Sequence, residues 1–238
     1  MNEDFNPSGV SLLITWLTRK YGLTESSAPI FHLVVANERK EDDLPKDWPT
    51  DNDLAFLRAL FTDCRPDELT YLLLKLPYQQ LPASFFQQTI AALLDVETSL
   101  ANPDLMGLAA NYLATHWNAF QLPTEPVRRL VESTDFNQRL AGLNALAHTN
   151  VPLADTLTII KPYLLEEEEQ EFWAGMANLL RILENWQSIP TSAEAVDRLP
   201  EIRSTLRAIS REDSLAQVAS ATDYRVALID KILAENAT

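Results

Sequence analysis

The chain has 238 residues, of which 46% are hydrophobic, so it is long enough to bury a core but short for three domains. Its 5 glycines disfavour folds that need glycine-rich turns or phosphate-binding loops, because glycine usually makes up about 7% of a chain. The 34 acidic and 19 basic side chains leave a net charge of −15, which repels nucleic-acid phosphates and anionic lipid headgroups.

The sequence shows no feature of a secreted or membrane protein. It begins with the acidic MNEDFNPSGV rather than a basic and then apolar leader, and no apolar run approaches the ~18 residues that cross a bilayer. Cys64 is the single cysteine, which excludes an internal disulfide framework. We therefore expect a soluble, cytoplasmic protein that binds neither nucleic acid nor membrane.

Apolar residues recur at helical spacing through most of the chain, and prolines mark the starts of many expected helices. In chain order, helices are expected over 9–21, 27–37, 53–62, 66–76, 82–96, 103–117, 124–132, 136–147, 152–165, 167–186, 193–199, 200–209, 212–219 and 223–235. Pro162 is expected to kink its helix or end it early. We divide the chain into an N-terminal helical cap with a polar loop, residues 1–52, and a helical repeat domain, residues 53–238.

The polar interval 38–53 is the clearest loop of the sequence. It is rich in charge and proline, and Leu44 and Trp48 are its main apolar residues. A solvated connector is the favoured interpretation, and a recognition loop that uses Trp48 is the alternative.

Small and large residues repeat at an offset of 33 residues. The small ones are Ala109, Gly142 and Gly175, and the large ones are Leu113, Leu146 and Leu179. Small side chains at a fixed turn allow two helices to approach closely, and a bulky residue one turn later fills the space between them. This pattern predicts stacked helical hairpins.

A second internal match suggests a helix, a tight turn and a further helix in two places. Residues 130–136 parallel residues 218–224, and both contain a Ser/Thr/Asp segment. We expect Asp135 and Asp223 to cap the helices that follow these turns.

The segment TDFNQRLAGLNAL at 134–146 opens with an Asp-containing turn and continues with Arg139, an alanine and an Ala-Leu pair. Here the chain resembles HEAT-like and armadillo-type repeat proteins, although Gln138 replaces an apolar residue and Gly142 an alanine. The resemblance covers about residues 66–186. It implies an all-α fold, a right-handed α-solenoid of stacked antiparallel helical hairpins with about 12–14 helices.

No pattern of reactive residues points to catalysis. The 3 histidines, His32, His116 and His148, are far apart and form no metal-binding motif. We expect His116 and His148 to cap helix ends, and His32 to be buried and hydrogen-bonded. Cys64 is favoured as an ordinary turn residue over a reactive thiol, because no histidine lies near it in the sequence. No catalytic residue, cofactor or metal is therefore expected.

The densest charge run is Glu166 to Glu169, just before Phe172 and Trp173. Its favoured interpretation is the first turn of a helix, where carboxylates stabilise the helix dipole, and the alternative is an acidic patch for a basic protein segment. For a partner-binding surface we single out Arg128, Arg139, Glu169 and Trp173. Arg139 is also expected to bond to the turn or an acidic group of a neighbouring repeat.

The leading functional hypothesis is a non-catalytic scaffold or adaptor. Its stacked helices would form a concave acidic surface for a protein partner with a basic segment. The alternative is a HEAT-like enzyme or ligand carrier. Of the types known among HEAT-like relatives, a chromophore lyase fits the charge of the chain, whereas a DNA glycosylase does not. Self-association through exposed end repeats is a third possibility.

Overall fold

A computed structural model describes residues 49–62, 64–76, 78–116, 119–165, 169–189, 192–212 and 216–236. The helices expected at 9–21 and 27–37, most of the polar loop, His32 and Trp48 lie outside these residues. Within them the chain forms α-helices and short 3-10 turns and no β-strand, so the predicted all-α class is confirmed for this part of the chain.

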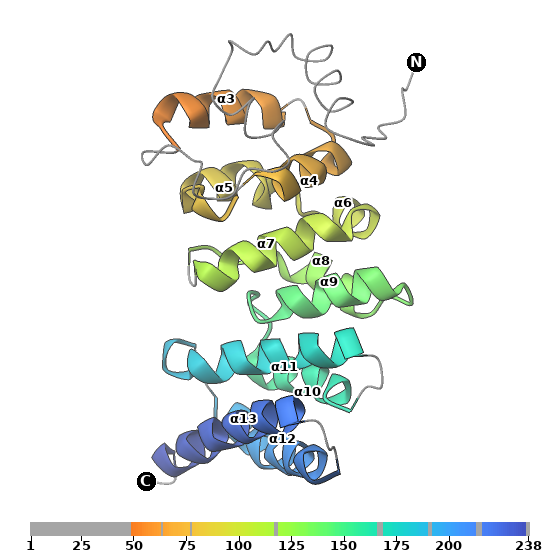
Figure 1. Cartoon of the computed structure of the whole chain (residues 1–238), viewed down its shortest axis with the longest axis vertical. Helices are drawn as coiled ribbons and strands as arrows, with labels where there is room; N and C mark the ends of the chain where they lie inside the picture. Colours follow the sequence, from red (N-terminus) through yellow and green to blue (C-terminus); the bar gives the residue numbers. More distant parts are fainter. Residues whose placement is uncertain are drawn as a thin grey trace.

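The helices follow one another along the long axis of the molecule (Figure 1). The α-helices are α3 Asp51–Thr62, α4 Pro66–Lys75, α5 Ala83–Thr89, α6 Val96–Ala101, α7 Pro103–Thr115, α8 Thr124–Val131, α9 Phe136–Leu146, α10 Leu153–Tyr163, α11 Glu169–Glu184, α12 Ala193–Glu212 and α13 Ala216–Glu235. Three 3-10 turns lie between them: η2 Tyr78–Gln80, η3 Ala91–Leu93 and η4 Trp186–Ser188.

From α6 onwards the helices form pairs: α6 with α7, α8 with α9, α10 with α11 and α12 with α13. The second helices of the pairs, α7, α9, α11 and α13, pack side by side in what we call the second-helix row. The first helices, α6, α8, α10 and α12, lie behind them in Figure 1 and form the first-helix row. In that row α6 packs on α8, and α10 packs on α12.

The stack has two long edges of different construction. At the turn edge, the first helix of a pair leads into the second, as at residues 132–135 between α8 and α9. At the connector edge, one pair leads to the next through connections that include residues 119–123, 147–152 and 185–189. The first-helix row therefore begins at the connector edge, and the second-helix row begins at the turn edge.

The residues of the 33-residue repeat lie at equivalent places in α7, α9 and α11. Leu113, Leu146 and Leu179 are all buried. A Cβ added to Gly142 would lie 2.6 Å from the backbone nitrogen of Val131 in α8. The predicted close approach of two helices is therefore observed here, and only glycine leaves room for it.

Local sequence determines several helix boundaries. Asp135 caps α9, because its carboxylate accepts a hydrogen bond from the backbone nitrogen of Gln138 at 3.0 Å. Pro66 and Pro103 occupy first turns, where the missing N–H costs nothing. Pro162 lies in the last turn of α10, which ends at Tyr163, as expected of an early stop.

The prediction of one continuous helix over 82–96 is wrong. This segment divides into α5 and η3, and the separate helix α6 begins at Val96. Asp95 starts that helix by accepting a 2.7 Å hydrogen bond from the backbone nitrogen of Thr98. The apolar residues on both sides of Asp95 continue the helical spacing, which is why the break was not predicted.

The break expected at Pro200 is also wrong, since α12 runs from Ala193 to Glu212 through this residue. Pro200 itself is exposed, and the buried side chains on its two sides, Leu199 and Ile202, continue one apolar face. Burial of this face against neighbouring helices offsets the backbone hydrogen bond that proline cannot donate.

The turn expected at 220–223 is wrong as well, because α13 is continuous from Ala216 to Glu235 and Asp223 caps no helix. The buried residues Val218, Thr222 and Arg225 follow helical spacing through the predicted turn. The Thr222 hydroxyl donates to the carbonyl oxygen of Ala219 at 2.8 Å, so it supports the helix instead of ending it.

The close approach at Gly142 generates a matched pair of tests. Gly142→Ala should lower the free energy of unfolding by about 1–3 kcal/mol, because the new methyl group meets backbone atoms of α8. Gly107→Ala in α7 should raise it by roughly 0.5–1 kcal/mol, since no atom lies within 4 Å of the new Cβ and alanine favours helix. Chemical denaturation measures both, and equal effects of the two substitutions would contradict the packing argument.

Candidate functional site

The four residues predicted to bind a partner lie toward the turn edge. Arg128 is exposed in the last turn of α8, and Arg139 is half-buried in the first turn of α9. Glu169, which is exposed, and Trp173, which is half-buried, belong to the first two turns of α11. The structure brings Arg139 close to α11, but among the described residues no hydrogen bond or ion pair joins Arg128 to the other three.

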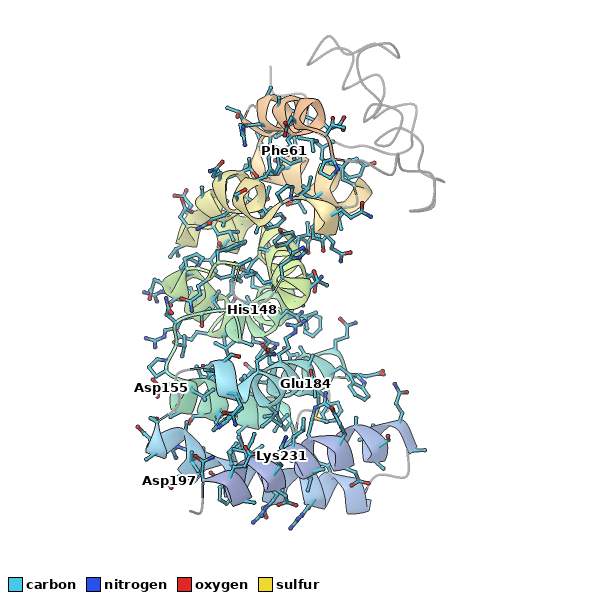
Figure 2. All side chains as sticks on the ribbon, turned by 90° about the vertical axis from the view of Figure 1, so that its left-hand side faces the viewer. Phe61, His148, Asp155, Glu184, Asp197 and Lys231 are labelled. Carbon is cyan, nitrogen blue, oxygen red and sulfur yellow. The ribbon has the colours of Figure 1, made fainter. Side chains whose placement is uncertain are left out.

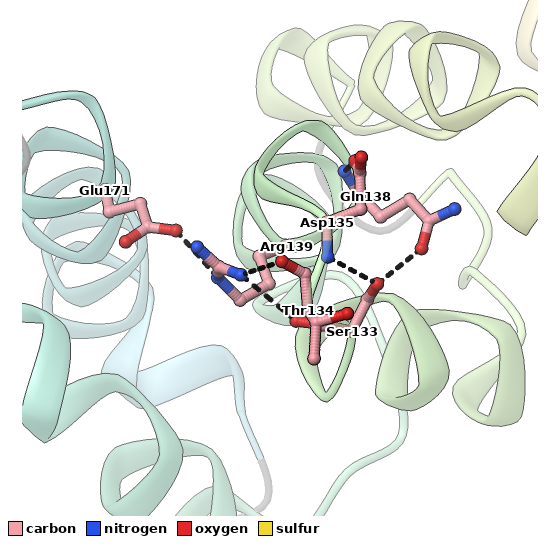
Figure 3. A network of polar contacts seen from close by, with 6 residues as sticks. All are labelled: Ser133, Thr134, Asp135, Gln138, Arg139 and Glu171. Carbon is pink, nitrogen blue, oxygen red and sulfur yellow. Dashed lines mark hydrogen bonds and ion pairs between the residues drawn. The ribbon is translucent and has the colours of Figure 1, made fainter.

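Arg139 is the centre of a polar network at this edge (Figure 3). Its Nε donates to Oε1 of Glu171 in α11 at 2.9 Å, and its Nη1 donates to the carbonyl oxygens of Ser133 at 3.2 Å and Thr134 at 2.8 Å. The Glu171 side chain is only 4% exposed, and that of Arg139 is 26% exposed. The expected bond from Arg139 to an acidic group of a neighbouring layer is therefore present, whereas the turn that it bonds is the one within its own pair.

The same turn is also tied to the preceding layer. Gln138 Nε2 donates to the carbonyl oxygen of Leu100 in α6 at 2.8 Å, and its Oε1 accepts from the Ser133 hydroxyl. The backbone nitrogen of Asp135 donates to that hydroxyl at 3.0 Å. Gln138 and Arg139 therefore connect one turn to the layers on both of its sides.

Polar side chains of α11 fasten it to the end of α9. Asn178 Oδ1 accepts from the backbone nitrogen of Ala147 at 3.1 Å, and its Nδ2 donates to the carbonyl oxygen of Leu143. Arg181 Nη1 donates to the carbonyl oxygen of Asn144 at 3.0 Å, and burial lowers the pKa of this guanidinium. These side chains donate to carbonyl oxygens in the last turn of α9, where the helix itself supplies no N–H partner.

Arg225 continues this arrangement into the last pair. It is 6% exposed, and its Nε donates to the carbonyl oxygen of Met176 in α11 at 2.9 Å. Burial lowers its pKa, while the charge of Glu184 opposes that change. The buried cations are thus held by hydrogen bonds between layers, an arrangement that suits structural support rather than proton transfer.

Trp173 and Glu169 differ in how far they are available to a partner. Trp173 packs partly against the core and meets Phe172 edge to face, with 5.2 Å between ring centroids. Glu169 is exposed in the first turn of α11 and is the last residue of the acidic run. The other three residues of that run, Glu166 to Glu168, lie outside the described residues.

A hollow of about 200 Å³ lies at the connector edge, where three connections meet. Phe120 and Gln121 from the α7–α8 connection form one wall, and His148 and Asn150 from the α9–α10 connection form another. Ile189, after η4, closes the third side. Figure 2 looks onto this edge, with His148 near the middle of the stack.

The two connections that line this hollow are bonded to each other. Leu122 and Thr149 form an isolated parallel β-bridge, and the backbone nitrogen of Leu122 donates to the carbonyl oxygen of His148 at 2.9 Å. The Thr149 hydroxyl accepts from the backbone nitrogen of Val151 at 3.3 Å, which shapes the turn before α10. These bonds give the wall of the hollow a defined backbone.

His148 is 6% exposed. Burial, aided by the charge of Arg181, lowers the pKa of its imidazole to about 3, so the ring is neutral near neutral pH. His116 at the end of α7 confirms its expected capping role, because its Nδ1 lies 3.1 Å from the carbonyl oxygen of Tyr112. The expected cap of α9 by a ring nitrogen of His148 stays a prediction.

A second, more open hollow of about 620 Å³ adjoins the first. Phe120 and Gln121 line both hollows, and Asp95 and Pro123 line the second. Phe120 is held from behind by Phe86, with 6.0 Å between ring centroids. Sequence reasoning missed both hollows, because their walls come from connections that only the stacking of layers brings together.

Other candidate chemistry is sparse among the described residues. Within them no three His, Cys, Asp or Glu side chains gather as a metal site would require, and no helix is long and apolar enough to span a membrane. Cys64 is half-buried between α3 and α4 and packs against the core. No family model matches the chain, and neither a curated protein nor a solved structure matches it significantly.

The network around Arg139 predicts a large loss of stability when its cation is removed. Arg139→Ala should lower the free energy of unfolding by about 3 kcal/mol, because the buried Glu171 carboxylate loses its ionic partner. Arg129→Ala should cost less than about 0.5 kcal/mol, since its pair with Glu125 is exposed. Urea denaturation measures both changes, and the added substitution Glu171→Gln should recover part of the first. A loss at Arg139 no larger than that at Arg129 would rule out the structural role.

The lowered pKa of His148 predicts a loss of stability in mild acid. The unfolded chain binds a proton at this imidazole below about pH 6.5, whereas the folded chain does so only near pH 3, so acid favours unfolding. Between about pH 7 and about pH 5 the free energy of unfolding should fall by about 2 kcal/mol from this group. His148→Gln should remove that decrease and His116→Gln should keep it. Denaturation curves at these two pH values measure the decrease in each variant. An unchanged decrease in His148→Gln would refute the assignment of the acid effect to His148.

Proposed function

We propose that this protein is a non-catalytic scaffold or adaptor that binds a protein partner with a basic segment. We further propose that its paired helices form a HEAT-like, right-handed α-solenoid. The observation that carries the proposal is the repeated close approach within pairs. Gly142 meets α8, and a Cβ on Gly175 would lie 3.1 Å from the Cβ of Tyr163 in α10. A repeat that stacks in this way extends the surface layer by layer, which suits recognition of another chain.

The distribution of charge supports a basic partner. Most cations of the described residues are engaged within the protein, in ion pairs such as Arg203–Asp230 at 2.8 Å or in bonds to backbone carbonyls, as at Arg181. Exposed carboxylates such as Glu97 and Asp155 have no ion pair among the residues that the structure describes. With a net charge of −15, the surface therefore attracts cationic segments and speeds their association at low salt.

The geometry of the hollows argues against the enzyme or ligand-carrier alternative. The smaller hollow of about 200 Å³ is below the ~300–1,000 Å³ of typical ligand sites, and no Asp or Glu lines it. The larger hollow is open, and the carboxylate of Asp95 at its rim is fully exposed. A desolvated acid beside a ligand-sized pocket, which acid–base chemistry would need, is not found in the described part of the chain.

Affinity capture tests the proposed function. The purified chain is immobilised and exposed to a lysate of its source cells at about 50 mM and about 500 mM salt, and the retained proteins and small molecules are identified. We expect one protein in near-stoichiometric amount, retained at low salt and released as salt rises. The partner is then purified, and its dissociation constant is measured at both salt concentrations.

Two outcomes would overturn the proposal. Retention of a small molecule with no protein partner would favour a ligand carrier or an enzyme. A purified partner whose affinity is indifferent to salt would contradict an acidic surface that recognises a basic segment.

A further inference from the structure

The connector edge offers a continuous and preorganised surface. Its two hollows meet at Phe120 and Gln121, and the bridge between Leu122 and Thr149 fixes the backbone between them. A surface whose backbone is already ordered loses little conformational entropy when a ligand binds to it.

The walls of the hollows carry little charge, and both expose apolar area. Phe120, Val151 and Ile189 contribute apolar area to the smaller hollow, and His148 is neutral there because burial lowers its pKa. The larger hollow is lined mainly by alanine, leucine and proline, and Asp95 is its one charged lining residue. Such walls suit apolar side chains of an incoming segment.

Carboxylates recur beside these hollows. Each first-row helix has an acidic residue in its first turn, namely Glu97 in α6, Glu125 in α8, Asp155 in α10 and Glu194 in α12. The helices of this row begin at the connector edge, so the carboxylates follow it from layer to layer. In Figure 2, Asp155 and Asp197 lie on the side of this row.

Helix dipoles explain why acidic residues are favoured at these positions, but they do not neutralise all of the charge. Glu125 pairs with Arg129 at 2.9 Å, and Glu194 lies 3.7 Å from Arg198. Asp95, Glu97 and Asp155 are without an ion pair in the described ranges. Carboxylates without an ion pair therefore remain beside both hollows.

We propose that the connector edge binds an extended protein segment in which Lys or Arg residues alternate with apolar residues. The apolar side chains enter the two hollows on either side of Gln121, and the cations pair with Asp95 and Asp155. This inference rests on the proposed function and names the site and chemistry of its partner. It places the partner at the edge opposite to Arg139, Glu169 and Trp173.

The turn edge is less suited to the same segment. Arg139 and Glu171 already bond each other there, and the exposed Arg128 would repel a cationic chain. Part of the Trp173 side chain packs against the core, which leaves less of it for a partner. At the connector edge, hollows that expose apolar area lie beside carboxylates that have no ion pair among the described residues.

The test uses a random library of peptides of roughly 12 residues, displayed on phage and selected on the immobilised full-length chain. The consensus peptide is synthesised with a fluorescent label, and its affinity is measured by anisotropy. We expect a consensus of apolar residues interspersed with Lys or Arg. A neutral or acidic consensus, or no enrichment of any sequence, would overturn the proposal.

Matched variants locate the peptide on the surface. Gln121→Trp fills the junction of the hollows from an exposed position and should weaken binding by more than about tenfold. Asp95→Asn with Asp155→Asn should weaken it by about fivefold at low salt, and asparagine preserves the cap of α6. The control variant Asp104→Asn with Glu132→Gln changes the net charge by the same amount at the turn edge. Its affinity for the peptide should stay within about twofold of the unmodified chain. Circular dichroism confirms that each variant is folded.

The outcomes separate this inference from the proposed function. Equal losses in both charge-neutralised pairs, or no loss in Gln121→Trp, would overturn the connector-edge site even if affinity capture has yielded a partner. Sedimentation that shows a dimer of the free chain, abolished by Gln121→Trp, would assign the edge to a second copy and also overturn it. If peptides bind as expected but no protein partner is captured, the scaffold function fails and the surface assignment stands.

Discussion

Bonds between successive layers are the interaction on which the rest of the structure depends. Helical pairs alone bury only part of their apolar surface, so each layer needs the next. Gln138, Arg139, Asn178 and Arg225 each donate to a backbone carbonyl or a carboxylate in an adjacent layer. Because a buried polar group without such a partner is costly, these bonds favour one register of stacking over its alternatives.

This use of polar side chains limits what the protein can do chemically. The buried arginines and Asn178 are held by carbonyls, and Glu171 is held by Arg139, so the polar groups of the interior serve the stack. The proposed scaffold function therefore rests on the surface of the molecule. The two edges differ, since the Arg139–Glu171 pair and its network occupy the turn edge, whereas the two hollows lie beside carboxylates at the connector edge.

Local signals in the sequence predicted much of the fold and little of the candidate site. The cap at Asp135, the early stop at Pro162 and the close approach at Gly142 follow from short-range chemistry, and all three are observed. The bond from Arg139 to a neighbouring layer was also predicted. The hollows were not, because Phe120 and His148 meet only through tertiary packing.

The sequence by itself determined the helical class, the small-residue columns and many helix boundaries, because helix spacing, proline and capping residues act within a few positions. Only the tertiary structure decided that α12 continues through Pro200 and that α13 continues through Asp223. In both helices the burial of one continuous face outweighs a local preference for a break. The tertiary structure likewise decided which connections face each other, since that depends on how successive layers stack.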